Sequence, residues 1–193
     1  VIMETEHGTT YNAYVLKTGG PVVLFETVKP EFFDEYIEKV QEITPLEAVE
    51  YLVVEHTEPD HAGSIERLIE QNPNIKIVGT ACALGFLKHI VNCDFYGLPV
   101  KDNDCLRVGE KTLHFFALPN LHWPDTMYTW IEEEKALLCC DSFGAHYSFD
   151  GVLRSEVTDE AAYESAVKYY FDHIIAPFRS FMRRALDRIE GLD

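Results

Sequence analysis

Long apolar runs are missing from this sequence of 193 residues, and no stretch approaches the ~20 apolar residues that a membrane helix needs. Residues 1–10 hold neither the charged nor the apolar segment of a signal peptide, so we expect a cytoplasmic protein that does not bind a membrane. Basic residues are also scarce, because 16 Lys and Arg stand against 33 Asp and Glu, a formal net charge of −17. A surface of this charge repels phosphate, which argues against nucleic acid as a partner.

Cysteine pairs with metal-binding spacing are lacking as well. The five cysteines are an odd number without a C-x-x-C pair, which argues against a disulfide framework and against a Cys-based zinc site. Cys139 and Cys140 lie in an apolar run, so we expect them to be packing residues. The sequence also lacks repeats and Pro- or Gly-rich linkers, which predicts one domain over residues 1–193.

Apolar periodicity predicts short strands followed by amphipathic helices, twice along the chain. The predicted strands are 11–17, 22–26, 52–54, 75–79, 112–118, 127–131 and 136–140, and the predicted helices are 32–43, one from about 64, 83–91, 159–174 and 178–189. A polar loop, residues 56–62, follows the third predicted strand. This order predicts an α/β fold with two sheets that are covered by helices on the outside.

The most informative segment is His56-Thr57-Glu58-Pro59-Asp60-His61, which places four potential metal ligands in six residues. Two further candidates, His122 and Asp141, each follow a predicted strand. Imidazole and carboxylate groups bind iron and zinc, and a solvated polar loop has no physical reason to gather two of each. These residues therefore predict a metal site at one edge of the sheets.

The pattern H-x-E-x-D-H, with His122 in L-H-W-P-D and Asp141 in C-D-S-F-G, resembles the metallo-β-lactamase-like domain of flavodiiron proteins, also called A-type flavoproteins. The resemblance runs from Tyr11 to about Ile189. It implies a four-layer αββα metallo-β-lactamase-like sandwich that is incomplete at its C-terminus. The strand with the family's last His ligand and the FMN-binding flavodoxin-like domain are not among these residues.

The resemblance also implies roles for the candidate ligands. His56, Glu58 and His122 would bind one iron, Asp60 and His61 would bind the second, and Asp141 would bridge the two together with a hydroxide or oxo group. The related zinc hydrolases typically have a His where Glu58 stands, and the harder carboxylate favours iron over zinc.

Three further residues are candidates for the surroundings of this site. Asp125 lies three residues after His122 and is placed to hydrogen-bond a ligand imidazole, or else to cap a turn after Pro124. His146 and Tyr147 follow Asp141 closely and are candidates for the pocket wall.

The function implied by the resemblance is that of a non-heme diiron oxidoreductase, which reduces O₂ to water, NO to N₂O, or both. Electrons would arrive through FMN on a flavodoxin-like domain, supplied by a rubredoxin-like or other redox donor, within a head-to-tail homodimer or a dimer of dimers. Two alternatives stay open. One is a zinc-dependent hydrolase of thioesters, lactones or lactams that uses metal-activated water. The other is a metal-free remnant that acts as a binding module.

Overall fold

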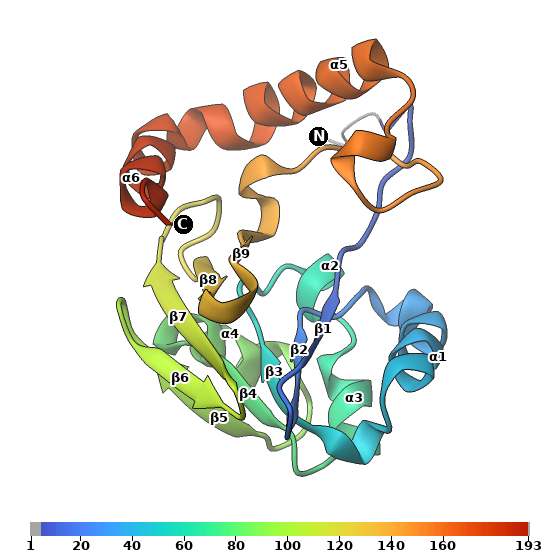
Figure 1. Ribbon diagram of the computed structural model, residues 1–193, viewed down its shortest axis with the longest axis vertical. Coiled ribbons are helices and arrows are strands. Elements are labelled where there is room, and N and C mark those ends of the chain that lie inside the picture. The colour runs from blue at the N-terminus through green and yellow to red at the C-terminus, as the bar shows by residue number, and fades with distance from the viewer. Residues whose placement is uncertain (1–4, 193) are drawn as a thin grey trace.

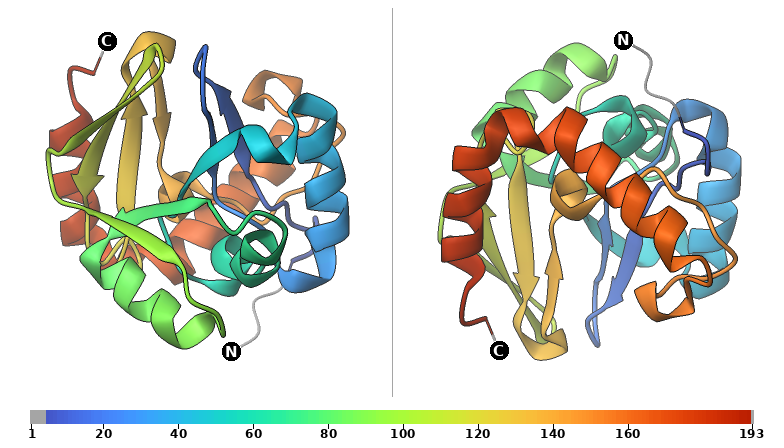
Figure 2. Two further views of the ribbon diagram at one scale, coloured as in Figure 1. Left: turned by 90° about the horizontal axis from the view of Figure 1, so that it is seen from below. Right: turned by 90° about the horizontal axis from the view of Figure 1, so that it is seen from above.

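Two β-sheets pack face to face, with helices on both outer faces, in the computed structural model, which describes residues 5–192 (Figures 1 and 2). Three apolar clusters fill the three interfaces between these four layers. The chain therefore has the α/β four-layer αββα sandwich that the sequence predicts.

The first sheet contains five strands in their order along the chain. They are β1 (Tyr14–Lys17), β2 (Val22–Phe25), β3 (Val49–Val53), β4 (Lys76–Thr80) and β5 (Tyr96–Val100). Only β1 is antiparallel to its neighbour, and the other four strands are parallel. The helices of this half are α1 (Phe33–Ile43), α3 (Ile65–Gln71) and α4 (Ala81–Ile90). Carboxyl ends of parallel strands meet at one edge, so the loops after β2 and β3 lie together.

The second sheet is antiparallel throughout. Its strands are β6 (Cys105–Val108), β7 (Lys111–Ala117), β8 (Met127–Ile131) and β9 (Ala136–Leu138), and its outer face is covered by α5 (Glu160–Tyr170) and α6 (Arg179–Ile189). The acidic run Glu132–Glu134 forms the turn between β8 and β9. A π-helical turn, Phe171–Ile175, follows α5 directly.

Alternation along the strands explains how one sheet serves two interfaces, because successive side chains of a strand point to opposite faces. In β2, Val22 and Leu24 pack under the helices, while Val23 and Phe25 pack between the sheets. In β8, Met127 faces the first sheet and Tyr128 faces the helices of the second.

The structure differs from the sequence prediction mainly at the sheet edges. Strand β5 was not predicted because Gly97 and Pro99 interrupt its apolar pattern, and Pro is tolerated there since β5 is an edge strand. Strand β6 has four residues and was also missed. The predicted loop 56–62 contains a short helix, α2 (Pro59–Ala62), in which proline takes the first position.

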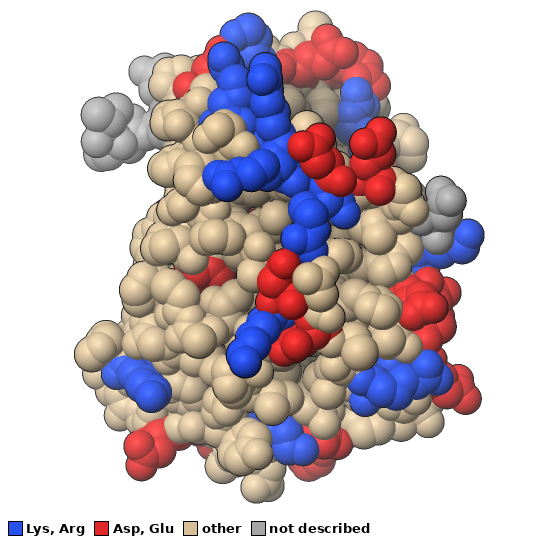
Figure 3. Space-filling view, turned by 90° about the vertical axis from the view of Figure 1, so that its left-hand side faces the viewer, with Lys and Arg blue, Asp and Glu red and all other residues tan. Residues whose placement is uncertain are grey.

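Charge is distributed unevenly over the surface. Figure 3 shows Lys and Arg side chains gathered in a column on the face where α6 runs. Helix α6 carries four arginines, Arg179, Arg183, Arg184 and Arg188. Among residues 5–192, only Arg188 of these four pairs with a carboxylate, that of Asp102 at 3.0 Å.

Within residues 5–192, no helix combines the length and apolar character required to cross a bilayer.

We expect opposite effects from alanine at two helical glycines. A Cβ on Gly63, at the end of α2, would lie 2.4 Å from the Pro59 carbonyl oxygen and 2.7 Å from Pro30 Cδ, whereas a Cβ on Gly85 in α4 meets no atom within 4 Å. Gly63→Ala should therefore lower the free energy of unfolding by about 1–3 kcal/mol through overpacking. Gly85→Ala should raise it by up to about 1 kcal/mol. Urea denaturation measures both, and equal midpoints for the two variants would contradict this packing.

Candidate metal centre

All six predicted ligands lie at the same edge of the two sheets. Four follow β3 of the first sheet, since His56 and Glu58 precede α2 and Asp60 and His61 lie within it. The other two come from the second sheet: His122 lies in the loop after β7, and Asp141 lies in a 3-10 turn, Cys140–Phe143, after β9. The site is thus assembled from both halves of the sandwich.

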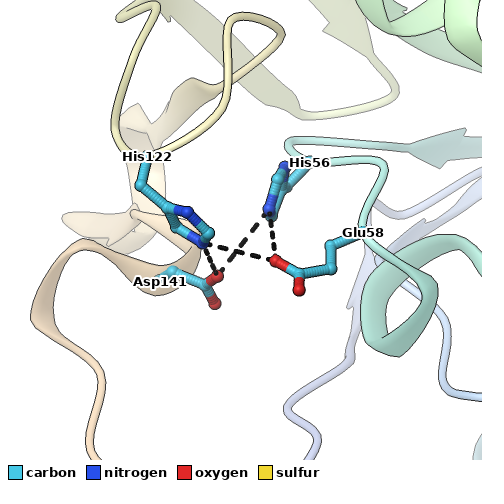
Figure 4. Close-up of side chains that lie close together, drawn as sticks. All are labelled: His56, Glu58, His122 and Asp141. Carbon is cyan, nitrogen blue, oxygen red and sulfur yellow. Dashed lines mark hydrogen bonds and ion pairs between the residues drawn. The ribbon is translucent and has the colours of Figure 1, made fainter. Parts of the chain in front are cut away.

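One group of donors consists of His56, Glu58, His122 and Asp141, whose ligand atoms all lie within 4.8 Å of one another (Figure 4). Glu58 Oε2 lies 3.2 Å from His56 Nε2 and 3.3 Å from His122 Nε2. Asp141 Oδ2 lies 3.3 Å from His122 Nε2 and 3.8 Å from His56 Nε2. The four side chains point toward a common centre.

A second group of donors lies on the other side of Asp141. Asp141 Oδ1 is 2.9 Å from His61 Nε2, and Asp60 Oδ2 is 3.9 Å from the same nitrogen. Cys140, which sequence reasoning treated as a packing residue, places its Sγ within 4.8 Å of donor atoms of His61 and Asp141. Asp141 therefore presents one carboxylate oxygen to each group.

Asp125, one of the candidates for the surroundings of the site, lies directly behind His56. Its carboxylate is buried, and Oδ1 lies 3.4 Å from His56 Nδ1. Its other oxygen accepts hydrogen bonds from the backbone N–H of Thr57 at 2.8 Å and from the Thr57 hydroxyl at 2.7 Å. Trp123 packs edge-on against the His56 ring, with centroids 5.0 Å apart. These contacts leave His56 Nε2 facing Glu58.

Glu26 contacts the Nδ1 atom of His61 as Asp125 contacts that of His56. The sequence analysis did not identify Glu26 as part of the site. It directly follows β2, is buried, and places Oε2 3.2 Å from His61 Nδ1. Its other oxygen accepts a hydrogen bond from the backbone N–H of Glu55 at 2.5 Å. The signal available in the sequence is a carboxylate that ends an otherwise apolar strand.

The second donor group opens into a cavity of about 160 Å³. His146 lines this cavity and packs edge-on against Tyr170, with ring centroids 5.1 Å apart. The Tyr147 ring instead packs against His7 and Tyr163 and is not part of the cavity lining.

The histidines and carboxylates strongly shift one another's pKa values. Hydrogen bonds from His122 and His56 lower the pKa of Glu58 to about 2. Burial alone would lower the pKa of His122, but its contacts with Asp141 and Glu58 raise it to about 9. Burial likewise opposes the charge of His61, whose pKa is nevertheless raised to about 11 by Asp141 and Glu26. In the metal-free chain, protons on the histidines therefore balance the negative carboxylates.

The donor chemistry fits two divalent cations that share Asp141. Three carboxylates within one small site repel each other unless cations or protons neutralise them. Imidazole and carboxylate donors suit iron, and the two buried carboxylates behind His56 and His61 fix the orientation of these rings in the way that metal ligands require. Two non-glycine residues beside the site, Glu26 and Cys140, also have positive φ angles, of 60° and 49°.

Comparison with known proteins agrees with this geometry. The sequence matches the family described as ODP family beta lactamase over residues 9–193. It is 40% identical over 195 aligned positions to the flavo-diiron protein FprA2 of Clostridium acetobutylicum, covering 100% of this chain and 48% of that protein. It is 36% identical over 190 positions to the nitric oxide reductase of Moorella thermoacetica, covering 98% and 47%. The chain spans about half the length of the curated relatives it matches.

The fold is likewise similar to that of solved structures. The rubredoxin oxygen:oxidoreductase from the anaerobe Desulfovibrio gigas superposes with a TM-score of 0.91 at 30% sequence identity. The superposition covers 97% of this chain and 46% of the other.

The raised pKa of His122 predicts how the metal-free chain responds to pH. The folded-state value of about 9 lies above the ordinary value of 6.5, so folding is favoured while His122 is protonated. This contribution is complete below pH 6.5 and is lost as the pH rises through 9. We expect the contribution of His122 to the free energy of unfolding of the metal-free chain to fall by up to about 3 kcal/mol over this range. Urea denaturation at several pH values measures the fall, and His122→Gln should make it shallower, leaving the part that comes from the raised pKa of His61.

Proposed function

Because the chain belongs to the ODP family of beta-lactamase-like proteins and has the fold of flavodiiron proteins, we propose that it binds two iron ions and reduces O₂ to water, NO to N₂O, or both. The observation that carries the proposal is the position of Asp141, with Oδ1 facing His61 and Oδ2 facing His122. A carboxylate placed between two donor groups is suited to bridge two cations.

We assign the ligands by the group in which each lies. His56, Glu58 and His122 would hold one iron, Asp60 and His61 would hold the second, and Asp141 would contribute to both. Residues 1–193 then form a metallo-β-lactamase-like diiron domain. When bound, the iron pair would supply a place for a diatomic molecule to bind and the capacity to take up and release electrons.

The chain's own residues orient the donors and control access to them. Asp125 and Glu26 hold His56 and His61 through their Nδ1 atoms, which keeps each Nε2 directed at the metal positions. His56 is fully buried, whereas the side chains of Glu58 and Asp60 are 36% and 33% exposed. The centre is therefore open to solvent on the side of these two carboxylates, while Trp123 packs against the buried His56 ring.

Electrons must come from outside the diiron centre, since reducing O₂ to water takes four. We propose that an FMN-carrying flavodoxin-like domain delivers them, supplied in turn by a rubredoxin-like or other redox donor and positioned by a head-to-tail dimer. The name of the Desulfovibrio gigas protein, which pairs rubredoxin with oxygen, supports this proposal. A cytoplasmic location suits ferrous iron and the five free cysteines.

Metal content and turnover on anaerobically prepared chain test the function together. We expect elemental mass spectrometry to find about two irons per chain, and we expect reduced FMN to support consumption of O₂ or NO in proportion to that iron. Zinc in place of iron, with cleavage of thioester or β-lactam reporters in the absence of a reductant, would instead identify a hydrolase. A chain that takes up no metal would contradict both enzymatic functions.

Substitution of Glu58 tests why the centre prefers iron. Glu58→His replaces a hard anionic donor with a softer neutral one, so bound metal should shift from iron toward zinc and turnover should fall. Competition between Fe²⁺ and Zn²⁺, read by elemental analysis, measures the shift. Glu38→His, on the exposed face of α1, is the matched control and should leave the preference unchanged. Unaltered iron retention in Glu58→His would refute the assigned role of this carboxylate.

A further inference from the structure

Trp123 lies against both histidines of the first donor group. Its ring packs at 82° to the His56 ring, with centroids 5.0 Å apart, and at 83° to the His122 ring, with centroids 6.5 Å apart. The two histidine rings are themselves 5.3 Å apart at an angle of 72°. Edge-to-face packing at such distances is an arrangement that aromatic rings favour. Three rings therefore form one packed cluster, in which both histidines direct Nε2 toward Glu58.

A carboxylate supports only one of these two histidines from behind. Asp125 Oδ1 lies 3.4 Å from His56 Nδ1. Within residues 5–192, the polar side-chain contacts of His122 all involve its Nε2 atom, which faces Glu58 and Asp141. Imidazoles that bind metals almost always use their other ring nitrogen to contact a carboxylate, a carbonyl or water. At His122, ring packing takes the place of a carboxylate in the described part of the chain.

The backbone that carries Trp123 is itself fixed. The Trp123 carbonyl oxygen accepts hydrogen bonds from the backbone N–H of Asn120 at 2.7 Å and from the Thr126 hydroxyl at 3.0 Å. The same loop contains His122 and Asp125. One loop thus delivers a donor of the first group together with the ring and the carboxylate that flank the other histidine.

We infer that Trp123 is a positioning residue of the proposed iron centre and fixes the angle between the rings of His56 and His122. The inference rests on the proposed function. Trp123 has no metal-binding group, so it acts only through these two histidines. Donors that are held in place before the metal changes charge need little rearrangement as electrons enter and leave. Trp123 therefore maintains both the affinity and the geometry of the first metal position.

The second tryptophan of the chain provides a matched control. Trp130 lies in β8, where it pairs in register with His114 of β7 and Leu137 of β9. Like Trp123 it is partly buried, but within residues 5–192 its ring is in contact with neither His56 nor His122. The same substitution at Trp130 therefore removes an indole ring without changing the cluster.

Titration of the metal-free 193-residue chain with Co²⁺ under anaerobic conditions tests the inference. The visible absorption of bound Co²⁺ reports the geometry of its ligands. We expect Trp123→Ala to alter this spectrum and to weaken Co²⁺ binding by roughly 10- to 100-fold, the usual cost of losing a residue that orients a metal ligand. Trp123→Phe keeps an aromatic ring and should restore most of the affinity and the original spectrum. Trp130→Ala should leave both unchanged.

Fluorescence gives a readout that keeps the native Trp123. In Trp130→Phe, Trp123 is the only tryptophan, and Co²⁺ bound by the histidines that it contacts should quench its emission. In Trp123→Phe, the emission of Trp130 should change less. Trp123 emission that is unaffected by two bound Co²⁺ would overturn the inference, whether or not the alanine variant folds.

The outcomes separate the inference from the proposed function. Two Co²⁺ bound with equal affinity and an identical spectrum in Trp123→Ala and in the unsubstituted chain would overturn the inference and leave the two-metal centre standing. Equal losses in Trp123→Ala and Trp130→Ala would overturn it as well, because the effect would then be one of general stability. A chain that binds no Co²⁺ would overturn both the inference and the proposed centre.

Discussion

The carboxylate of Asp141 joins the two halves of the protein at the edge where all the donors meet. Asp141 follows β9 in the second sheet, yet its Oδ1 lies 2.9 Å from His61 of the first sheet, and its Oδ2 lies 3.3 Å from His122. Much of the interface between the sheets is apolar, and the attraction between apolar side chains has no preferred direction. The directional contacts of Asp141, together with the hydrogen bonds from Thr57 to Asp125, therefore align the donors of the two sheets.

Sequence patterns predicted the parts of this structure that are local. The strands of the two sheet interiors show clear apolar alternation, and the segment 56–61 carries its ligands within six residues. Glu26 was missed as part of the site because it reaches His61 only through the topology, which brings the end of β2 beside the loop that follows β3. Strand β5 was missed for a local reason, since glycine and proline weaken its pattern.

Buried polar groups at this same edge of the sheets lower the free energy of unfolding. Within residues 5–192, Glu55 Oε1 at this edge is buried without a hydrogen-bond partner. Burial and the nearby charge of Glu26 raise the pKa of Glu55 well above its ordinary value. Each unsatisfied buried group costs about 1–3 kcal/mol. Metal bound only by the folded chain adds its binding free energy to folding and offsets this cost.

The arginines of α6 have a consequence for the molecule as a whole. A chain with net charge −17 carries four of its 16 basic residues on this one helix (Figure 3). The separation of charge makes the protein an electric dipole, with its positive pole at α6. A charged molecule that approaches within the ~8 Å Debye length of physiological salt experiences a torque before it makes contact. A negatively charged molecule is attracted toward α6, and a positively charged molecule is attracted toward the acidic rest of the surface. The charge distribution therefore orients charged molecules relative to the protein before they bind.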